Sequence, residues 1–135
     1  RAQIVDEIIR PALARGNIIL CDRFHDATVA YQGYGLGIDI KLIGYMGRFV
    51  TGGIMPDLTV LLDIGVKKGL ERAGKDKDRI ELRALAYHRR VRRGYLYIAK
   101  LDPDRVKVVK VNKAITDTQA QVRGIVEEFL CHLKK

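Results

Sequence analysis

Hydrophobic residues along this chain follow two alternating patterns. In three places they form short, nearly unbroken apolar runs, which predict buried strands at 17–22, 58–62 and 106–111. Because helices and strands alternate, we predict an α/β domain with a parallel sheet and helices on both faces. The helices are expected where apolar residues recur every three or four positions, over 1–15, 24–32, 39–50, 66–73, 79–101 and from Thr116 through Leu133.

Glycine, proline and a capping residue mark helix boundaries. Gly16 is placed to end the first helix, and Pro11 is expected to kink that helix or loosen its last turn. Asp39 can accept hydrogen bonds from the first amides of the helix 39–50, and Gly52 follows that helix. These signals support the predicted boundaries independently of hydrophobicity.

Two opposite charges follow the first predicted strand directly. Asp22 and Arg23 would lie at the carboxyl edge of the sheet, which is where open α/β sheets bind ligands. The carboxylate can hold a metal ion through water, and the guanidinium can make a forked contact with a phosphate. The alternative is a structural ion pair between the two residues at a strand end.

The helix after this pair carries polar groups at helical spacing. Thr28, Tyr31 and Gln32 would lie on one side and offer a hydroxyl, a phenol and an amide to a polar ring. For Tyr31, packing in the core is an equal alternative. Glycines at 33, 35 and 37 are expected to open a mobile loop, since they follow a helix and so do not form a dinucleotide fingerprint.

The loop 74–79 is rich in charge and begins with glycine. Its cations Lys75, Lys77 and Arg79, together with Arg72 before it, suit a lid that closes over phosphates. A solvated turn between helices is the commoner structure for such a run, and the residues alone favour it.

Composition limits the class of protein. A chain of 135 residues forms one domain or part of one, and it has no apolar run of membrane-spanning length and no signal-peptide pattern. Cys21 and Cys131 are expected to be reduced thiols of a cytoplasmic protein, and the scattered histidines predict no metal site.

The net charge of +9 is typical of proteins that bind polyanions, although acidic groups elsewhere in a longer protein would explain it equally well. Five arginines lie on one face of the helix 79–101, but no aromatic or glycine pattern accompanies them for base stacking. We therefore expect a solvated surface there, and neither specific nucleic-acid binding nor membrane binding. The arginines are Arg83, Arg89, Arg90, Arg92 and Arg93.

Four segments, in order, resemble the thymidylate kinase family. Asp22-Arg23-Phe24 followed by Ala30-Tyr31-Gln32-Gly33 is similar to the family signature, with Ala27 where the family usually has serine. The family's helix, next strand and lid end are matched by residues 1–13, Pro56–Asp63 and Asp78–Glu81. The match covers nearly the whole chain, and it favours the lid over the solvated turn at 74–79.

The resemblance implies a nucleoside monophosphate kinase that transfers the γ-phosphoryl group of ATP to dTMP with Mg²⁺. It implies that Arg23 holds the acceptor phosphate and that Asp22 orients Mg²⁺ through water or orients the acceptor. Thr28 and Gln32 would contact the base, and Tyr31 would pack near base or sugar. In the lid, Arg72 and Arg79 would be the catalytic cations, and Lys75 and Lys77 would assist on the phosphates. Glu81 would anchor the lid or border the sugar. In the loop before the last helix, Lys113 and Ala114 would lie at the adenine.

One expected motif is absent from the sequence. A phosphate-cradling loop needs G-x-x-x-x-G-K-[ST], which this family carries on its first strand, and the chain contains no such run. We therefore expect residues 1–135 to be the C-terminal part of a three-layer, P-loop NTPase-like kinase domain that lacks its first βα unit, with the missing segment and a second copy in a homodimer as partners. The alternative is a non-catalytic, basic remnant that binds nucleotides or nucleic acid.

Overall fold

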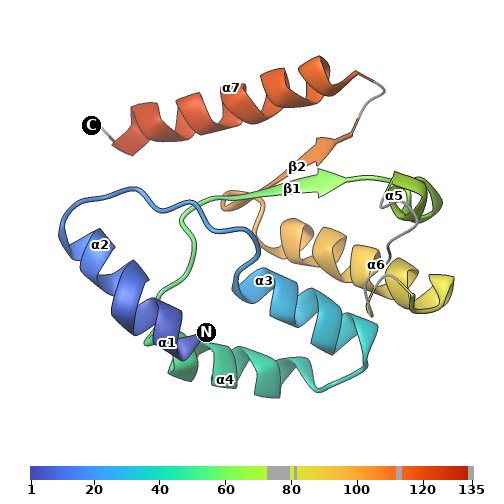
Figure 1. The fold of residues 1–135 in the computed structure, drawn as a ribbon, viewed down its shortest axis with the longest axis horizontal. Coiled ribbons are helices and arrows are strands. Elements are labelled where there is room, and N and C mark those ends of the chain that lie inside the picture. The colour runs from blue at the N-terminus through green and yellow to red at the C-terminus, as the bar shows by residue number, and fades with distance from the viewer. Residues whose placement is uncertain (73–79, 81, 112–113, 134–135) are drawn as a thin grey trace.

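The structure is a computed structural model that describes residues 1–72, 80, 82–111 and 114–133. Two strands, β1 (Thr59–Asp63) and β2 (Val106–Lys110), pair in parallel, with Thr59 opposite Val106 and Asp63 opposite Lys110. Val109 is only 1% exposed, whereas Val108 on the opposite face of β2 is 40% exposed, so one face of this strand is better covered than the other. Figure 1 shows α7 (Ile115–Leu133) on one side of this sheet and α6 (Leu85–Leu101) on the other. The predicted α/β class with a parallel sheet is confirmed.

The segment 17–22 is not a strand, so the prediction of a buried strand there is wrong. Its residues form no regular secondary structure and most of them are exposed, with Ile18 70% and Leu20 94% accessible to solvent. A strand needs a neighbour for its backbone N–H and C=O groups, and the described sheet consists of β1 and β2 alone. The segment therefore has the composition of a strand, but no neighbouring strand in the described sheet pairs with it.

The first helix forms as predicted, in three consecutive pieces. These are α1 (Ala2–Ile4), the π-helical turn η1 (Val5–Ile9) and α2 (Arg10–Ala14). The π-helical turn lies directly before Pro11, whose ring nitrogen cannot donate the next helical hydrogen bond. Gly16 then ends the helix with φ +77° and donates its N–H to the carbonyl of Leu13 at 2.9 Å.

The helix after Arg23 is longer than predicted. It begins as α3 (His25–Thr28) and continues as the π-helix η2 (Val29–Gly35), so Gly33 and Gly35 are helical and the predicted loop begins only at Leu36. Gly35 is buried against α6, where an added Cβ would lie 2.7 Å from a ring carbon of Tyr87. The glycines are therefore required for close packing and not for mobility.

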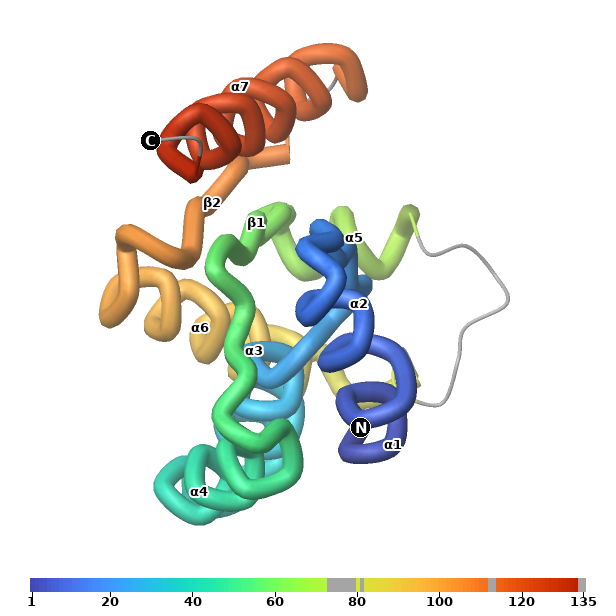
Figure 2. The backbone as a smooth tube through the Cα atoms, turned by 90° about the vertical axis from the view of Figure 1, so that its left-hand side faces the viewer, coloured from blue at the N-terminus to red at the C-terminus, as the bar shows by residue number. Residues whose placement is uncertain are grey.

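The remaining helices follow the predicted ones with shifted ends. Asp39 caps α4 (Ile40–Thr51) by accepting from the N–H of Lys41 at 2.8 Å, and Gly52 ends it in the left-handed region. α5 (Val66–Arg72) matches its prediction, whereas α6 begins at Leu85, six residues after the predicted start. Figure 2 shows α7 apart from the other helices. No helix in these described residues is long and apolar enough to cross a membrane.

Candidate functional site

Asp22 and Arg23 form a bend that leads from the exposed segment into α3. Arg23 has φ +64°, and it is the one non-glycine residue with positive φ in the described parts of the chain. This conformation costs an L-residue about 1–2 kcal/mol, and such strain is concentrated at functional sites. Both side chains are exposed, and the ion pairs found between described residues involve neither of them. The alternative of a structural Asp22–Arg23 ion pair therefore finds no support.

Tyr31 connects Arg23 to the helix α6. The guanidinium carbon of Arg23 lies 5.3 Å from the centre of the Tyr31 ring, which is a cation–π distance. The same ring makes edge contacts with Tyr87 and Tyr95, at centroid distances of 6.4 Å and 6.1 Å. Tyr31 therefore packs against the core and also supports the arginine, so its two predicted roles are compatible.

Tyr95 is the most strongly perturbed tyrosine beside Arg23. Burial raises the pKa of Tyr95 to about 12, and the nearby Tyr31 adds to the shift while Arg23 opposes it. The phenol therefore stays protonated at neutral pH and presents a hydrogen-bond donor next to the Arg23 bend.

Thr28 and Gln32 lie on the other side of the same helix, in a pocket of about 340 Å³ between η2 and α4. Their hydroxyl and amide are among few polar groups in this pocket, whose other lining residues include Ile43 and Met46 of α4. Such a cavity suits a planar ring with a few polar edges. The structure thus separates Thr28 and Gln32 from Tyr31, which contacts α6 instead.

Arg1 also lines this pocket and was not among the predicted site residues. Its guanidinium carbon lies 5.2 Å from the centre of the Phe24 ring, next to Arg23 in sequence. No local pattern marks Arg1, because it lies at the start of the first helix, far in the sequence from Arg23, Thr28 and Gln32. Only the pairing of Arg1-Ala2-Gln3 with the Asp-Arg-Phe segment in one family pattern gave a signal.

His25 forms the buried end of the pocket. It is 6% exposed and lies so close to Gly47 of α4 that an added Cβ there would collide with the imidazole ring. Burial is the main reason that its pKa is lowered, with Arg1, Arg48 and Arg105 acting in the same direction and Asp26 opposing them. His25 is therefore expected to be neutral at pH 7.

The predicted lid and adenine loop lie mostly outside the described residues. Arg72 is exposed at the last position of α5, and Ala114 is exposed directly before α7. The other predicted residues of these loops fall outside the described ranges: Lys75, Lys77, Arg79, Glu81 and Lys113. Their roles stay predictions.

The basic face of α6 is largely engaged within the protein. Arg90 donates two hydrogen bonds to the carbonyl of Gly35, at 3.1 and 2.8 Å. Arg92 forms a bidentate pair with Asp63, at 2.6 and 2.8 Å, and Arg83 lies over the Tyr87 ring. Arg83, Arg90 and Arg92 therefore also contact other parts of the protein, and the expectation of no specific nucleic-acid binding stays a prediction.

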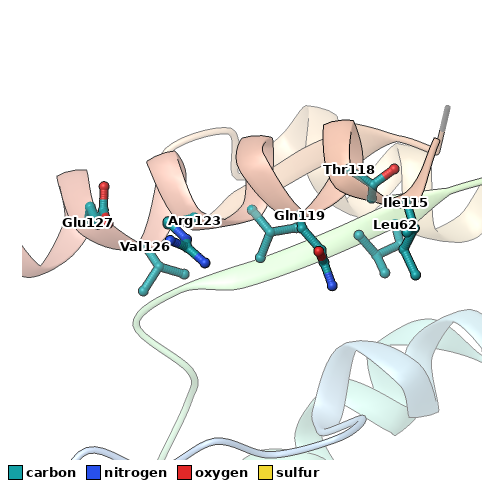
Figure 3. Close-up of a pocket in the computed structure, with 8 residues that line it drawn as sticks. Leu62, Ile115, Thr118, Gln119, Arg123, Val126 and Glu127 are labelled. Carbon is teal, nitrogen blue, oxygen red and sulfur yellow. The ribbon is translucent and has the colours of Figure 1, made fainter.

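A larger hollow of about 710 Å³ lies between β1 and α7, apart from the residues predicted to bind ligands. Figure 3 shows Ile115 of α7 beside Leu62 of β1, with Gln119 of the same helix reaching toward the strand. The hydroxyl of Thr118 is buried there and finds no hydrogen-bond partner in the described residues. α7 therefore covers the sheet incompletely.

Asp22 suits a magnesium ion held together with substrate phosphates. Mg²⁺ in kinases takes one or two carboxylates and completes its shell with water and phosphate oxygens. An exposed carboxylate without an ion-pair partner fits this need. The described residues contain no group of three or more histidine, cysteine or acidic side chains that would hold a metal ion by themselves.

The sequence and the fold resemble known thymidylate kinases. The sequence model described as Thymidylate kinase matches residues 1–122. Thymidylate kinases of Desulfovibrio desulfuricans and Kosmotoga olearia are both 43% identical, over 139 and 137 residues, covering 96% and 100% of this chain and 64% of each of those proteins. A crystal structure of thymidylate kinase from Ehrlichia chaffeensis has a TM-score of 0.73 at 32% identity and covers 94% of this chain and 60% of that one. The chain thus spans less than two thirds of the length of these relatives.

Proposed function

The chain belongs to the thymidylate kinase family, and we propose that its protein is a transferase of nucleotide biosynthesis that moves the γ-phosphoryl group of ATP to dTMP, giving dTDP. The observation that carries this proposal is the strained Arg23, held over Tyr31 without an ion-pair partner, near a pocket lined by Thr28 and Gln32. Phosphoryl transfer depends on positioned charge more than on covalent chemistry, so a fixed guanidinium is a fitting acceptor group.

We assign the phosphate of the acceptor nucleotide to Arg23, at the start of the α3–η2 helix, and its base to the pocket between η2 and α4. Arg23 would bind the phosphate of dTMP through a forked contact, with Tyr31 beneath the guanidinium and near the base or sugar. Thr28 and Gln32 would offer a hydroxyl and an amide to the edge of the thymine. Arg1 would close the same pocket.

The donor side depends on the metal and on the lid. Mg²⁺, when bound, would supply positive charge that neutralises the phosphates. Asp22 would orient this ion through water or orient the acceptor. Arg72 and Arg79 would be the catalytic lid cations, Lys75 and Lys77 would assist on the ATP phosphates, and Glu81 would anchor the lid. Lys113 and Ala114 would lie at the adenine.

Replacement of Arg23 tests the function. We expect Arg23→Ala to lower kcat/KM for dTMP by at least about 10²-fold, as removal of a positioned charge does. Arg15→Ala is the matched control, because Arg15 is exposed just after α2, does not line the pocket that holds Thr28 and Gln32, and takes part in no ion pair among the described residues. A change of less than about threefold in Arg23→Ala would remove Arg23 from the mechanism, given the usual size of such effects. Nucleotide binding without turnover by the unaltered protein would favour the non-catalytic alternative.

We also propose that a further strand completes the sheet, as in a P-loop NTPase fold, and that residues 1–135 are the C-terminal part of that domain. Two observations support this. The described sheet pairs β1 on one edge only, and Ile18 and Leu20 expose apolar side chains in a segment without regular secondary structure. The hollow beside Leu62 would accept side chains of the same added segment. A phosphate-binding loop after this strand would face the Asp22–Arg23 bend.

The proposed oligomer is a homodimer formed through the first helix and α4. α4 exposes Leu42, Tyr45 and Phe49, the last of them 79% accessible, and the neighbouring first helix exposes Ile4 and Ile8. Figure 1 shows the first helix next to one end of α4, where Arg10 lies close to Gly52. An apolar surface of this kind suits a self-complementary contact between two copies. Phe49→Glu is expected to give monomers in analytical ultracentrifugation, and an unchanged dimer would exclude this face.

We place the reaction in the cytoplasm. Cys21 and Cys131 are both free and exposed, and they lie far apart in sequence. Exposed unpaired thiols are typical of reducing compartments.

A further inference from the structure

A buried charge network joins three distant segments next to the proposed site. Asp26 of α3 is 7% exposed, and its carboxylate accepts two hydrogen bonds from Arg105, Nη1 to Oδ2 at 2.7 Å and Nη2 to Oδ1 at 3.0 Å. The hydroxyl of Thr59 donates to the same carboxylate at 2.9 Å and accepts from Arg105 at 3.1 Å. The Nε of Arg105 donates to Asp102 at 2.6 Å.

The network fixes direction as well as distance. A guanidinium that meets a carboxylate through two parallel hydrogen bonds can hold it in only one plane, whereas a lysine would hold it as a point charge. The hydrogen bonds that Arg105 donates to Asp26 and Asp102 raise the pKa of Arg105, so this side chain remains charged at any working pH. The pair is therefore a permanent, oriented connection.

The connection reaches the helix at the turn that bears the proposed ligand-binding residues. Asp26 is three residues after Arg23 and two before Thr28, on the first turn of α3. Its partners belong to the sheet: Thr59 is the first residue of β1, and Arg105 directly precedes β2. The rest of the helix packs on α6 through η2, so the Asp26–Arg105 pair is what ties its first turn to the strands.

Stability alone is a weak explanation for this arrangement. Burying two charges removes them from water, and a well-packed apolar pair of similar volume often serves as well or better. What an apolar pair does not supply is the fixed orientation of the forked contact. The geometry therefore indicates that the Asp26–Arg105 pair serves to fix the orientation of α3.

We propose that Asp26 and Arg105 are positioning residues that orient the first turn of α3, so that Arg23 and Thr28 face the acceptor nucleotide. This inference rests on the proposed function, since it concerns the same dTMP site. Neither residue needs to contact dTMP itself. Loss of the pair should weaken use of dTMP while use of ATP is unaffected.

The test is a comparison of two Arg→Lys variants in steady-state kinetics. Arg105→Lys keeps the charge and removes the fork, and we expect KM for dTMP to rise about tenfold while KM for ATP stays within about twofold. Arg92→Lys is the control, because Arg92 makes the same bidentate contact with Asp63 but connects α6 to β1. It should leave KM for dTMP within about twofold of the wild-type value.

A second pair of variants guards against misfolding. Asp26→Asn is nearly isosteric, and the double variant Asp26→Leu with Arg105→Leu replaces the buried charges by apolar groups, so that stability is retained without the fork. Both should fold, as judged by thermal melting, and both should show the raised KM for dTMP. A wild-type KM for dTMP in the folded double variant, or an equal rise in both KM values, would overturn the inference alone. A wild-type enzyme that does not phosphorylate dTMP would overturn the proposed function and this inference with it.

Discussion

Gly94 provides a sharp test of how closely η2 packs on α6. It lies in the middle of α6, and an added Cβ would come within 2.6 Å of two ring carbons of Tyr34 and 2.7 Å of its Cβ. These atoms lie near the backbone of η2 and cannot move aside without displacing the helix. We therefore expect Gly94→Ala to destabilise the protein, although alanine is the better helix former.

Two opposing terms set the size of the effect. Replacing a mid-helix glycine by alanine gains about 1 kcal/mol from helix propensity, and overpacking a close contact costs about 1–3 kcal/mol. The contact involves rigid atoms, so we take the upper part of that range and expect a net loss of about 1–2 kcal/mol. At Gly44, in the middle of α4, nothing lies within 4 Å of an added Cβ, so Gly44→Ala should gain the full propensity term of about 1 kcal/mol.

Thermal melting of the two variants measures this difference directly. For a chain of this size about 1 kcal/mol corresponds to a shift of about 4 °C in Tm, so the melting temperatures should differ by about 10 °C. Gly124→Ala in α7 is a second open position and should behave like Gly44→Ala. A Gly94→Ala protein that melts at or above Gly44→Ala would show that η2 and α6 are not in close contact.

Three further outcomes are expected. His25 has a lowered pKa in the folded state, so the unfolded state binds the proton more readily. The free energy of unfolding should therefore fall as the pH decreases through about 6.5. In urea titrations, His25→Gln should show a weaker dependence of this free energy on pH. Arg23→Asn should be about 1 kcal/mol more stable than Arg23→Ala in the same assay, because asparagine tolerates φ +64° and both variants lose the contact with Tyr31. In hydrogen-exchange measurements, the amides of Ile18 and Leu20 should exchange rapidly in the 135-residue chain. They should exchange slowly in a longer protein in which a strand and a phosphate-binding loop precede this chain. Equal exchange rates in the two proteins would argue against the added strand.

Local signals predicted most helix boundaries and both strands that form. Asp39 caps α4 and Gly16 ends α2, as predicted. Each makes its hydrogen bond with a backbone group two or three residues away, so the signal is local in the sequence. β1 and β2 were recognisable because each is an apolar run whose partner lies within the chain. These features depend on nearby residues or on a pairing that the chain itself completes.

The errors concern features that depend on distant partners. Residues 17–22 have the composition of a strand, but composition cannot tell whether a neighbouring strand is available. Gly33 and Gly35 were predicted to lie in a loop because the sequence does not reveal that Ile40 of α4 approaches Gly33 and that Tyr87 of α6 approaches Gly35. The Asp26–Arg105 pair was likewise missed, since the two residues are far apart in sequence and neither stands in a recognisable spacing.

The parallel pairing of β1 with β2 has a consequence for how the chain folds. The whole of α6 lies between the two strands in sequence, so β1 leaves the ribosome well before its partner exists. Closing so long a connection is slow compared with forming the helices, which need only neighbouring residues. We therefore expect the helices to form first during synthesis and β1 to pair with β2 last. Until then the apolar side chains of β1 are exposed and must be kept from aggregating.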